Sequence, residues 1–386
     1  LTRDEGVTWY GWETVNADPQ TFELFAIGRN NGGQLGQNNR TDYSSPVQIS
    51  GTKWDMVTSQ VGGDGLSQMG AIKNDGTLWT WGDNERGALG QNNVVDYSSP
   101  VQVPGTTWAS IEGKYNGFLA TKTDGTLWGW GFNTYGILGQ NSQVGYSSPV
   151  QIGSDTTWGT EHQHLAAGGQ YVGAIKTDGT LWLWGYGSNG RLGQNGPHMG
   201  SNRSSPVQIP GTTWASISFA NTSSYATKTD GTLWAWGDNP DGVTLGLGDS
   251  NKRSSPTQIP GTTWGTQYQE LASHAYGAAC IRTDGTLWAW GYGSNGVLGQ
   301  NGPTSQYNSP KQIPGTTWRS VAGQFHCMAA TKTDGTFWAW GSNQQGGLGQ
   351  NNRTDYSSPR QVPGTTWGKN IGAAGMRTFF GTKSAG

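Results

Sequence analysis

One phrase recurs seven times along this chain of 386 residues. It reads TKTDGTLWAWG at 227–237, and its most degenerate copy is ELFAIG at 23–28. A second phrase, SSPVQ or a close variant, and a third, GTTW, recur with the same period of roughly 50 residues, which is typical of solenoids and propellers rather than of several unrelated domains. The glycines that close the main phrase are Gly28, Gly82, Gly131, Gly185, Gly237, Gly291 and Gly341.

Each repeat contains four candidate strands: the run after GTTW, the run that ends in TKTDG, the TLWAWG segment and a short VQI segment. The Asp-Gly pair between the second and third is a strong hairpin signal, because glycine adopts a positive φ without steric cost. The two tryptophans of TLWAWG lie on one face of the strand, and Leu and a small residue lie on the other. Sheets of this kind can stack on copies of themselves.

The two ends of the chain indicate a closed ring. Residues 378–386, TFFGTKSAG, stop where a TLWAWG strand should follow, and ELFAIG at 23–28 has no first or second strand before it. Half a blade at each end makes a whole blade only in a ring. We therefore predict an all-β, seven-bladed β-propeller with four-stranded blades over residues 21–386. Residues 22–50 and 367–384 would form a shared blade with two strands from each terminus, and residues 1–20 would be an arm or a linker.

The motif WxWG followed by NxxGxLGQ resembles the regulator of chromosome condensation repeat family over about residues 21–386. The resemblance implies a seven-bladed propeller closed by strands from both termini. The founding member is a nucleotide-exchange factor for a small GTPase and docks on chromatin through a basic tail and an inserted hairpin, and this sequence shows neither. Other relatives are secreted bacterial proteins that inhibit β-lactamases. The near-identical copies of LGQNN and of the consensus YSSPVQIPGTTW, which reads YSSPVQVPGTTW at 97–108, most resemble proteins of bacteriophages and marine bacteria.

The composition argues against several classes of partner. The net charge is −2 and no run of basic residues is present, so we expect no nucleic-acid binding. No apolar stretch reaches the roughly 18 residues of a membrane-spanning helix, so we expect no membrane insertion. Cys280 and Cys327 lie at different offsets in neighbouring repeats, so we expect two buried thiols rather than a disulfide.

Antiparallel strands place the loops of each blade alternately on two faces of the ring. The TDG turns and PGTT links share one face, which we call the repeated face. The other connections share the divergent face, where the copies differ and where specialised contacts are expected. Aromatic and arginine side chains are the usual anchors of protein interfaces. The candidate binding residues on the divergent face are Arg86, Tyr115, Phe132, Tyr135, Tyr186, Arg191, Phe219, Tyr268, Tyr292, Phe325 and His326.

Catalytic and metal-binding interpretations have less support. His162 and His164, with Glu161 beside them, could hold a metal, but no further ligand is identifiable. One divergent loop could attract calcium, although its spacing matches no calcium loop; its carboxylates are Asp238, Asp241 and Asp249. No glycine-rich phosphate loop leads from a strand into a helix. We therefore expect no catalytic residues, no cofactor, no metal and no enzyme activity.

These features favour a non-enzymatic structural or binding protein. The sequence of the repeats favours a bacteriophage virion component, such as a tail, fibre or surface decoration, located in the virion or outside the cell. Its expected partners are other virion proteins or a host-surface receptor. One alternative is a secreted bacterial propeller that binds or inhibits a protein, and another is a nucleotide-exchange factor for a small GTPase.

Overall fold

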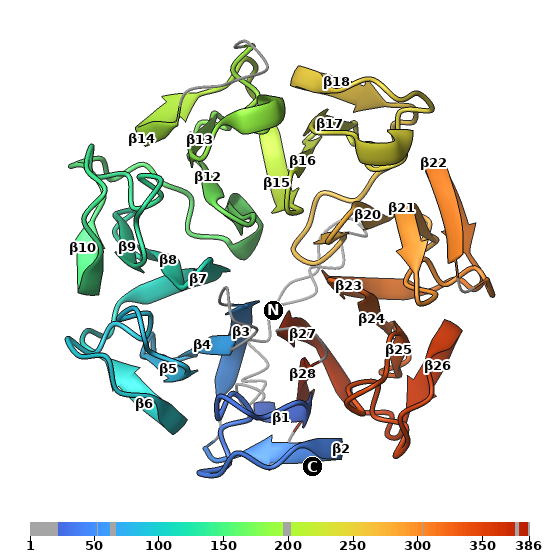
Figure 1. The fold of residues 1–386 in the computed structure, drawn as a ribbon, viewed down its shortest axis with the longest axis horizontal. Coiled ribbons are helices and arrows are strands. Elements are labelled where there is room, and N and C mark those ends of the chain that lie inside the picture. The colour runs from blue at the N-terminus through green and yellow to red at the C-terminus, as the bar shows by residue number, and fades with distance from the viewer. Residues whose placement is uncertain are drawn as a thin grey trace, which may run out of the picture.

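The protein is described here by a computed structural model that covers residues 22–51, 53–61, 67–195, 202–302, 304–374 and 378–384. The expected arm or linker, residues 1–20, lies outside these described residues. Seven four-stranded antiparallel sheets are arranged around a central axis (Figure 1). The predicted all-β, seven-bladed propeller is confirmed.

Six blades are continuous in sequence, and each runs from an inner strand beside the axis to an outer strand at the rim (Figure 1). Blade 1 contains β3 (Trp54–Val61), β4 (Ser67–Lys73), β5 (Leu78–Gly82) and β6 (Tyr97–Val103), and blade 2 contains β7 (Trp108–Lys114), β8 (Gly117–Lys122), β9 (Leu127–Gly131) and β10 (Tyr146–Gln151). Blade 3 contains β11 (Leu165–Ala167), β12 (Tyr171–Ile175), β13 (Leu181–Gly185) and β14 (Arg203–Gln208), and blade 4 contains β15 (Trp214–Phe219), β16 (Ser223–Lys228), β17 (Leu233–Gly237) and β18 (Arg253–Ile259). Blade 5 contains β19 (Leu271–His274), β20 (Gly277–Ile281), β21 (Leu287–Ser294) and β22 (Thr304–Ile313), and blade 6 contains β23 (Trp318–Gln324), β24 (Cys327–Lys332), β25 (Phe337–Gly341) and β26 (Tyr356–Val362). Three short 3-10 helices lie in connections: η1 (His162–His164), η2 (Ser188–Gly190) and η3 (Pro240–Gly242).

The seventh blade, the closing blade, takes two strands from each end of the chain. Its order is β2 (Tyr43–Ile49), β1 (Phe22–Gly28), β28 (Thr378–Ser384) and β27 (Trp367–Ala374). β1 pairs with β28 without interruption from Phe22–Ser384 to Gly28–Thr378. The shared blade predicted from the two chain ends is thus present with the expected strands.

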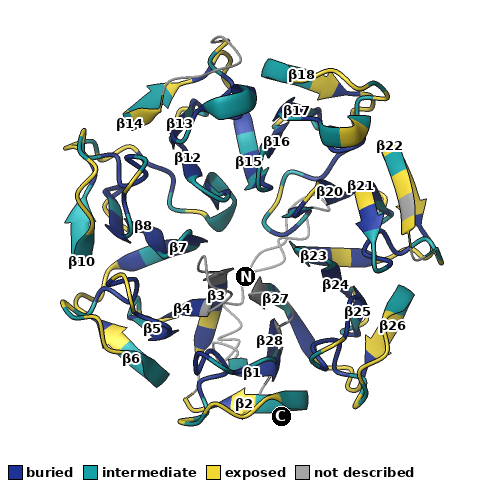
Figure 2. Ribbon diagram, in the orientation of Figure 1, coloured by how far each residue is buried: buried dark blue, intermediate teal, exposed yellow. Residues whose placement is uncertain are grey.

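The hydrophobic core lies between neighbouring blades, as Figure 2 shows by the buried inner and middle strands. In one cluster, Met56 and Leu78 of blade 1 pack with Trp108, Phe118 and Trp130 of blade 2. This agrees with sheets that pack face to face through side chains of both layers. Cys280 and Cys327 are buried in blades 5 and 6 and are not joined in a disulfide.

The TDGT turn on the repeated face is held by its aspartate. In blade 1, Asp75 Oδ1 accepts hydrogen bonds from Thr77 N at 3.0 Å and from Thr77 Oγ1 at 2.6 Å. The Thr77 hydroxyl in turn accepts from Trp79 Nε1 at 3.0 Å. Gly76 has a φ of 75°, and a Cβ there would lie 2.3 Å from the carbonyl oxygen of Thr106. The same turn is built by Asp124, Asp178, Asp230, Asp284 and Asp334.

Each blade also holds one cation between two aromatic rings near the repeated face. In blade 2, Lys122 Nζ lies 4.9 Å from the ring centroid of Trp108 and 4.1 Å from that of Trp128. Such cation–π contacts favour a partly desolvated ammonium group. The other cations are Lys73, Lys176, Lys228, Arg282, Lys332 and Lys383. No sequence motif predicted this arrangement.

The NxxGxLGQN loop joins each blade to the next. Asn84 Oδ1 accepts from Leu89 N at 2.8 Å, which fixes the loop of blade 1. Gly87, with a φ of 68°, lies so close to blade 2 that a Cβ there would be 2.5 Å from the Cβ of Ser147. Asn92 N then donates to Ser147 O at 2.7 Å. The motif therefore serves mainly to join the ring.

Candidate functional site

The third-to-fourth and first-to-second connections of a blade lie together on the divergent face. In blade 2, Phe132 N donates to Asn116 O at 2.8 Å, so the start of one connection contacts the turn of the other. Equivalent bonds link Tyr186 to Gln170 and Tyr292 to Tyr276. The two-face arrangement expected from strand alternation is present.

A set of aromatic side chains runs over blades 1 to 3 on this face, and we call it the aromatic strip. It consists of Arg86, Tyr115, Phe132, Tyr135 and Tyr186. The Tyr115 ring packs edge-on against Phe132 with centroids 5.5 Å apart, and the guanidinium carbon of Arg86 lies 5.8 Å from the Phe132 centroid. Tyr135 and Tyr186 have centroids 4.8 Å apart. Arg86 is exposed and the four rings are half-buried, so the strip is open to solvent.

A second aromatic cluster lies over blades 5 and 6. Tyr292 is 38% exposed, and its ring centroid is 6.5 Å from that of Tyr276, which is 39% exposed. Half-buried Phe325 and His326 follow β23, and Ser294 Oγ lies 2.9 Å from His326 Nδ1. The sequence analysis did not single out Tyr276, although it occupies a first-to-second turn within a divergent segment.

Two predicted binding residues lie beneath the divergent face rather than on its surface. Phe219 is 6% exposed and stacks on Tyr171 with centroids 5.0 Å apart. Arg191 is also 6% exposed, and it donates to the carbonyl oxygens of Ser188 at 2.9 Å and Asn221 at 3.2 Å. Phe219 therefore packs in the core between blades 3 and 4, and Arg191 packs within the loops, which corrects their expected placement as surface anchors.

Tyr268 also lies away from its expected position. The inner strand of blade 5 is interrupted after a bridge between Trp264 and Arg282, and β19 begins only at Leu271. Residues 265–270 leave the sheet near the repeated-face end and enter the central channel (Figure 1). Blade 3 has the same interruption over residues 159–164, after a bridge between Trp158 and Lys176. These two segments, which we call the channel loops, were expected to be connections on the divergent face.

The two channel loops contact each other and the inner strands around them. The rings of His162 and Tyr268 stack with centroids 4.3 Å apart. The side-chain amide of Gln269 makes two hydrogen bonds to the backbone of Ile371 in β27. Its Oε1 accepts from Ile371 N at 3.1 Å, and its Nε2 donates to Ile371 O. Val321 N of β23 donates to Gln269 O at 2.7 Å. The loops thus form a floor across part of the channel.

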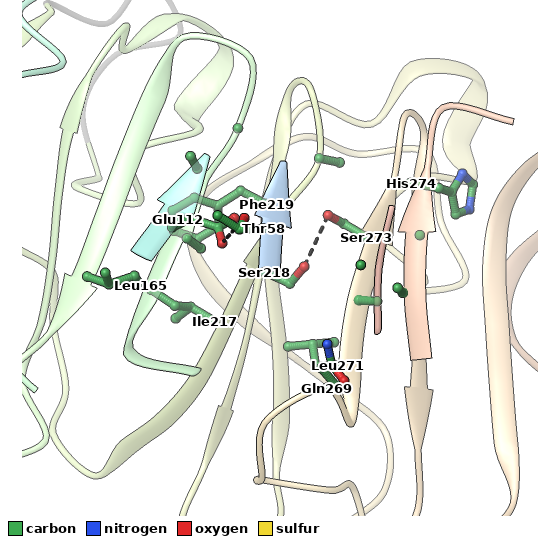
Figure 3. A pocket seen from close by; sticks show the side chains of 18 of the residues that line it. Thr58, Glu112, Leu165, Ile217, Ser218, Phe219, Gln269, Leu271, Ser273 and His274 are labelled. Carbon is green, nitrogen blue, oxygen red and sulfur yellow. Dashed lines mark hydrogen bonds between the residues drawn. The ribbon is translucent and has the colours of Figure 1, made fainter. Parts of the chain in front are cut away.

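A cavity of about 520 Å³ lies in the channel above this floor. Its lining runs from His162 and Tyr268 in the channel loops to Tyr115, Arg191 and Phe325 at the divergent face. Between these ends it is lined by hydroxyl groups, such as the Ser218–Ser273 pair, whose Oγ atoms are 3.1 Å apart (Figure 3).

Glu112 is the carboxylic acid of this cavity. Its Oε2 accepts from Thr58 Oγ1 at 3.3 Å (Figure 3). Burial raises the pKa of the Glu112 carboxyl to about 8. Burial also lowers the pKa of His162 to about 3, so this ring is neutral at physiological pH. The pKa of Tyr268 is raised, first by burial and then by the charge of Glu112.

The residues considered as metal ligands are placed as follows. Among the described residues, no group of three or more His, Cys, Asp and Glu side chains converges as a metal site would. Asp238 Oδ1 lies 2.9 Å from Lys252 Nζ, and Asp249 Oδ2 lies 2.6 Å from Arg253 Nη2.

None of the helices in the described part of the chain is long and apolar enough to cross a membrane.

Comparisons with known proteins agree with this architecture. Residues 23–380 match the family model of the RCC1-like domain. RCC1 domain-containing protein RUG3, mitochondrial, of Arabidopsis thaliana is 28% identical over 320 residues, which cover 76% of this chain and 71% of that protein. Human E3 ubiquitin-protein ligase HERC2 is 33% identical over 78 residues, or 20% of this chain. That match spans only 2% of HERC2.

Solved structures show the same fold. Yeast RCC1 (Prp20), in a crystal structure with Kap60, superposes with a TM-score of 0.79 at 18% identity, covering 95% of this chain and 89% of that chain. Human WBSCR16 superposes with a TM-score of 0.78 at 19% identity, covering 94% of this chain and 100% of that chain. A second structure of Prp20p, from Saccharomyces cerevisiae, is described together with its binding to Gsp1p and histones. At these identities the likeness concerns the fold.

Proposed function

The chain belongs to the RCC1-like domain family, and we propose that it is a non-enzymatic binding protein that holds a protein partner on its divergent face. The observation that carries the proposal is the aromatic strip over blades 1 to 3. Arg86, Tyr115 and Phe132 form one contact group, and Tyr135 and Tyr186 form the next. Solvent-accessible aromatic and arginine side chains on a rigid scaffold are typical anchors of protein interfaces.

The rigid support of the strip strengthens this proposal. The connections that carry Phe132 and Tyr186 are bonded to neighbouring turns of their own blades, and the loop that carries Tyr135 is joined to the next blade by a bond from Asn141 N to Ser204 O at 2.7 Å. Anchors held in place in the free protein lose less conformational entropy on binding. On the repeated face of blade 2, by contrast, the ammonium group of Lys122 lies over the rings of Trp108 and Trp128.

A site-specific crosslinking experiment tests this proposal. A photoreactive phenylalanine analogue at Tyr135 should crosslink one protein from the native source, and the same analogue at exposed Thr106 on the repeated face should not. With that partner, Phe132→Ala plus Tyr135→Ala should weaken binding by about 2 kcal/mol or more. Thr106→Ala plus Thr212→Ala, two exposed positions of the repeated face, is the matched control. Crosslinking at Thr106 instead would contradict the proposal.

We further propose that this binding takes place in a bacteriophage virion or outside the cell, with virion proteins or a host-surface receptor as the partner. The support is the likeness of the LGQNN and YSSPVQIPGTTW phrases to phage and marine-bacterial sequences. Mass spectrometry of purified particles from the source should then detect this chain. Detection only in particle-free culture fluid would favour a secreted bacterial propeller.

Nucleotide exchange on a small GTPase is the second candidate. The observation behind it is the fold shared with Prp20p, whose described binding to Gsp1p belongs to that yeast protein at 18% identity. An exchange factor should accelerate release of a fluorescent guanine nucleotide from its GTPase. Acceleration by this chain that is lost in the Phe132→Ala plus Tyr135→Ala variant would favour exchange over simple scaffolding.

A further inference from the structure

The channel cavity is built by features that the other blades lack. The channel loops of blades 3 and 5 replace part of their inner strands, whereas β7, β15 and β23 run without such an interruption. The loops meet through the stacked rings of His162 and Tyr268. Gln269 fixes them to β23 and β27 through backbone bonds. The floor is therefore a defined structure rather than a loose connection.

The lining of the cavity combines the Glu112 carboxyl group with aromatic rings. Glu112 lines the cavity from β7, and η1, which carries His162, contacts β7. The cationic side chain of the lining is Arg191, which lies at the divergent-face end and is held by two carbonyl oxygens and by the ring of Tyr186. The carboxyl group of β7 and the stacked rings of the floor therefore line the same cavity.

We propose that this cavity binds a primary alkylammonium ion, with its charge against the Glu112 carboxylate and its hydrocarbon chain along the stacked Tyr268 and His162 rings. An ammonium group gains both from an anionic partner and from an aromatic face. A cavity of about 520 Å³ has the size usual for small-molecule sites. The ion can be a free alkylamine or the side chain of a lysine. This proposal does not rest on the protein contact proposed for the aromatic strip, although Tyr115 belongs to both the strip and the cavity lining.

The protonation state of Glu112 gives the binding a distinct signature. In the empty cavity, the raised pKa of about 8 keeps this carboxyl mostly protonated at pH 7. An ammonium ion beside it favours the carboxylate, so binding at pH 7 should release about one proton per ligand. Affinity should rise between pH 6 and about 8 and then level off, because the carboxyl is already ionised. His162, with its pKa of about 3, and Tyr268, with its raised pKa, do not titrate in this range.

Isothermal titration calorimetry of the whole chain with n-hexylamine tests the proposal. Titrations in buffers of different ionisation enthalpy should show the proton release, and Glu112→Gln should abolish it and weaken binding about tenfold or more. The matched control is Glu161→Gln, an exposed carboxylate in the same channel loop as His162. A blocked lysine, Nα-acetyl-lysine N-methylamide, forms the second arm. Binding of that compound alone would identify a lysine side chain as the source.

Three results would overturn the proposal. One is that neither amine binds to the unmodified protein. Another is equal affinity for n-hexanol, which would mean that the cavity binds the hydrocarbon chain without any preference for the ammonium group. The third is binding without proton release at pH 7, measured on the unmodified protein, so the test does not depend on the folding of any variant.

Discussion

The imidazole ring of His162 stacks on the phenol ring of Tyr268, with centroids 4.3 Å apart and an angle of 23° between the planes. The two residues belong to blades 3 and 5, so their contact crosses the channel in front of the inner strand of blade 4. The hydrophobic clusters of blades 1 and 2 and of blades 2 and 3, by contrast, join direct neighbours. This pair therefore couples two blades that share no sheet interface.

We expect the stacked pair to contribute measurably to stability. In a double-mutant cycle of His162→Ala and Tyr268→Ala, the coupling energy from urea unfolding should be about 0.5–1.5 kcal/mol, the range for stacked aromatic pairs. A cycle of His162→Ala with Tyr276→Ala is the control, since Tyr276 lies on the divergent face. Zero coupling in the first cycle would show that the rings are adjacent without stabilising each other.

Ring closure should be essential for a soluble fold. Deletion of residues 378–384 and beyond removes β28, which pairs with β1 along its whole length. The deletion leaves an unpaired edge on β1 and an unsupported β27, and exposed edges promote aggregation. Thermal unfolding followed by light scattering should show a lower transition and aggregation. Removal of residues 385 and 386 alone leaves β28 whole and should leave the transition unchanged.

The architecture could be predicted from the sequence because each of its determinants is a local signal repeated many times. The Asp-Gly turn predicts a hairpin in six of the seven copies, and the incomplete repeats at the two ends predict the closing blade. The placement of Phe132, Tyr135 and Tyr186 on one face follows from strand alternation alone. That rule holds wherever a blade has four uninterrupted strands.

Tyr268 was misplaced because the inner strands of blades 3 and 5 are interrupted, so the rule does not hold for the segments that follow Trp158 and Trp264. From Trp264 to Gly291 there are 27 positions, against 23 from Trp108 to Gly131. This excess signals an insertion, but sequence spacing does not tell whether the extra residues lengthen a turn or leave the inner strand. Arg191 was expected at the surface, but its guanidinium group donates hydrogen bonds to the loop carbonyl oxygens of Ser188 and Asn221. Such bonds depend on tertiary geometry rather than on local pattern.

The cation between two aromatic rings should stabilise its blade through its charge. Lys122→Met retains most of the hydrocarbon chain beside Trp108 and Trp128 but removes the ammonium group. We expect a loss of about 1 kcal/mol in the free energy of unfolding. Lys53→Met, at an exposed position, should change it far less. If both variants lose the same small amount, the contact with the rings contributes only through apolar packing.

Buried Lys114 should make stability depend on pH in a predictable direction. It is fully buried, and its Nζ donates to Phe132 O at 2.9 Å. Burial lowers its pKa from 10.5 to about 7 in the folded protein. Between pH 7 and about 10 the unfolded chain therefore binds more protons than the folded chain at this residue, and stability rises with pH.

Lys114→Met should remove this rise. The free energy of unfolding of the unmodified protein minus that of the variant, measured by urea unfolding at several pH values, should increase from pH 7 to about 10. Taking the difference cancels other groups that titrate in the same range, such as buried Cys280, whose raised pKa acts in the opposite sense. Lys252→Met, which removes a partly exposed lysine paired with Asp238, should give no such increase over this range. If the difference is flat over this range, Lys114 keeps its proton in the folded protein. Groups other than the carbonyl of Phe132 then also stabilise its ammonium form.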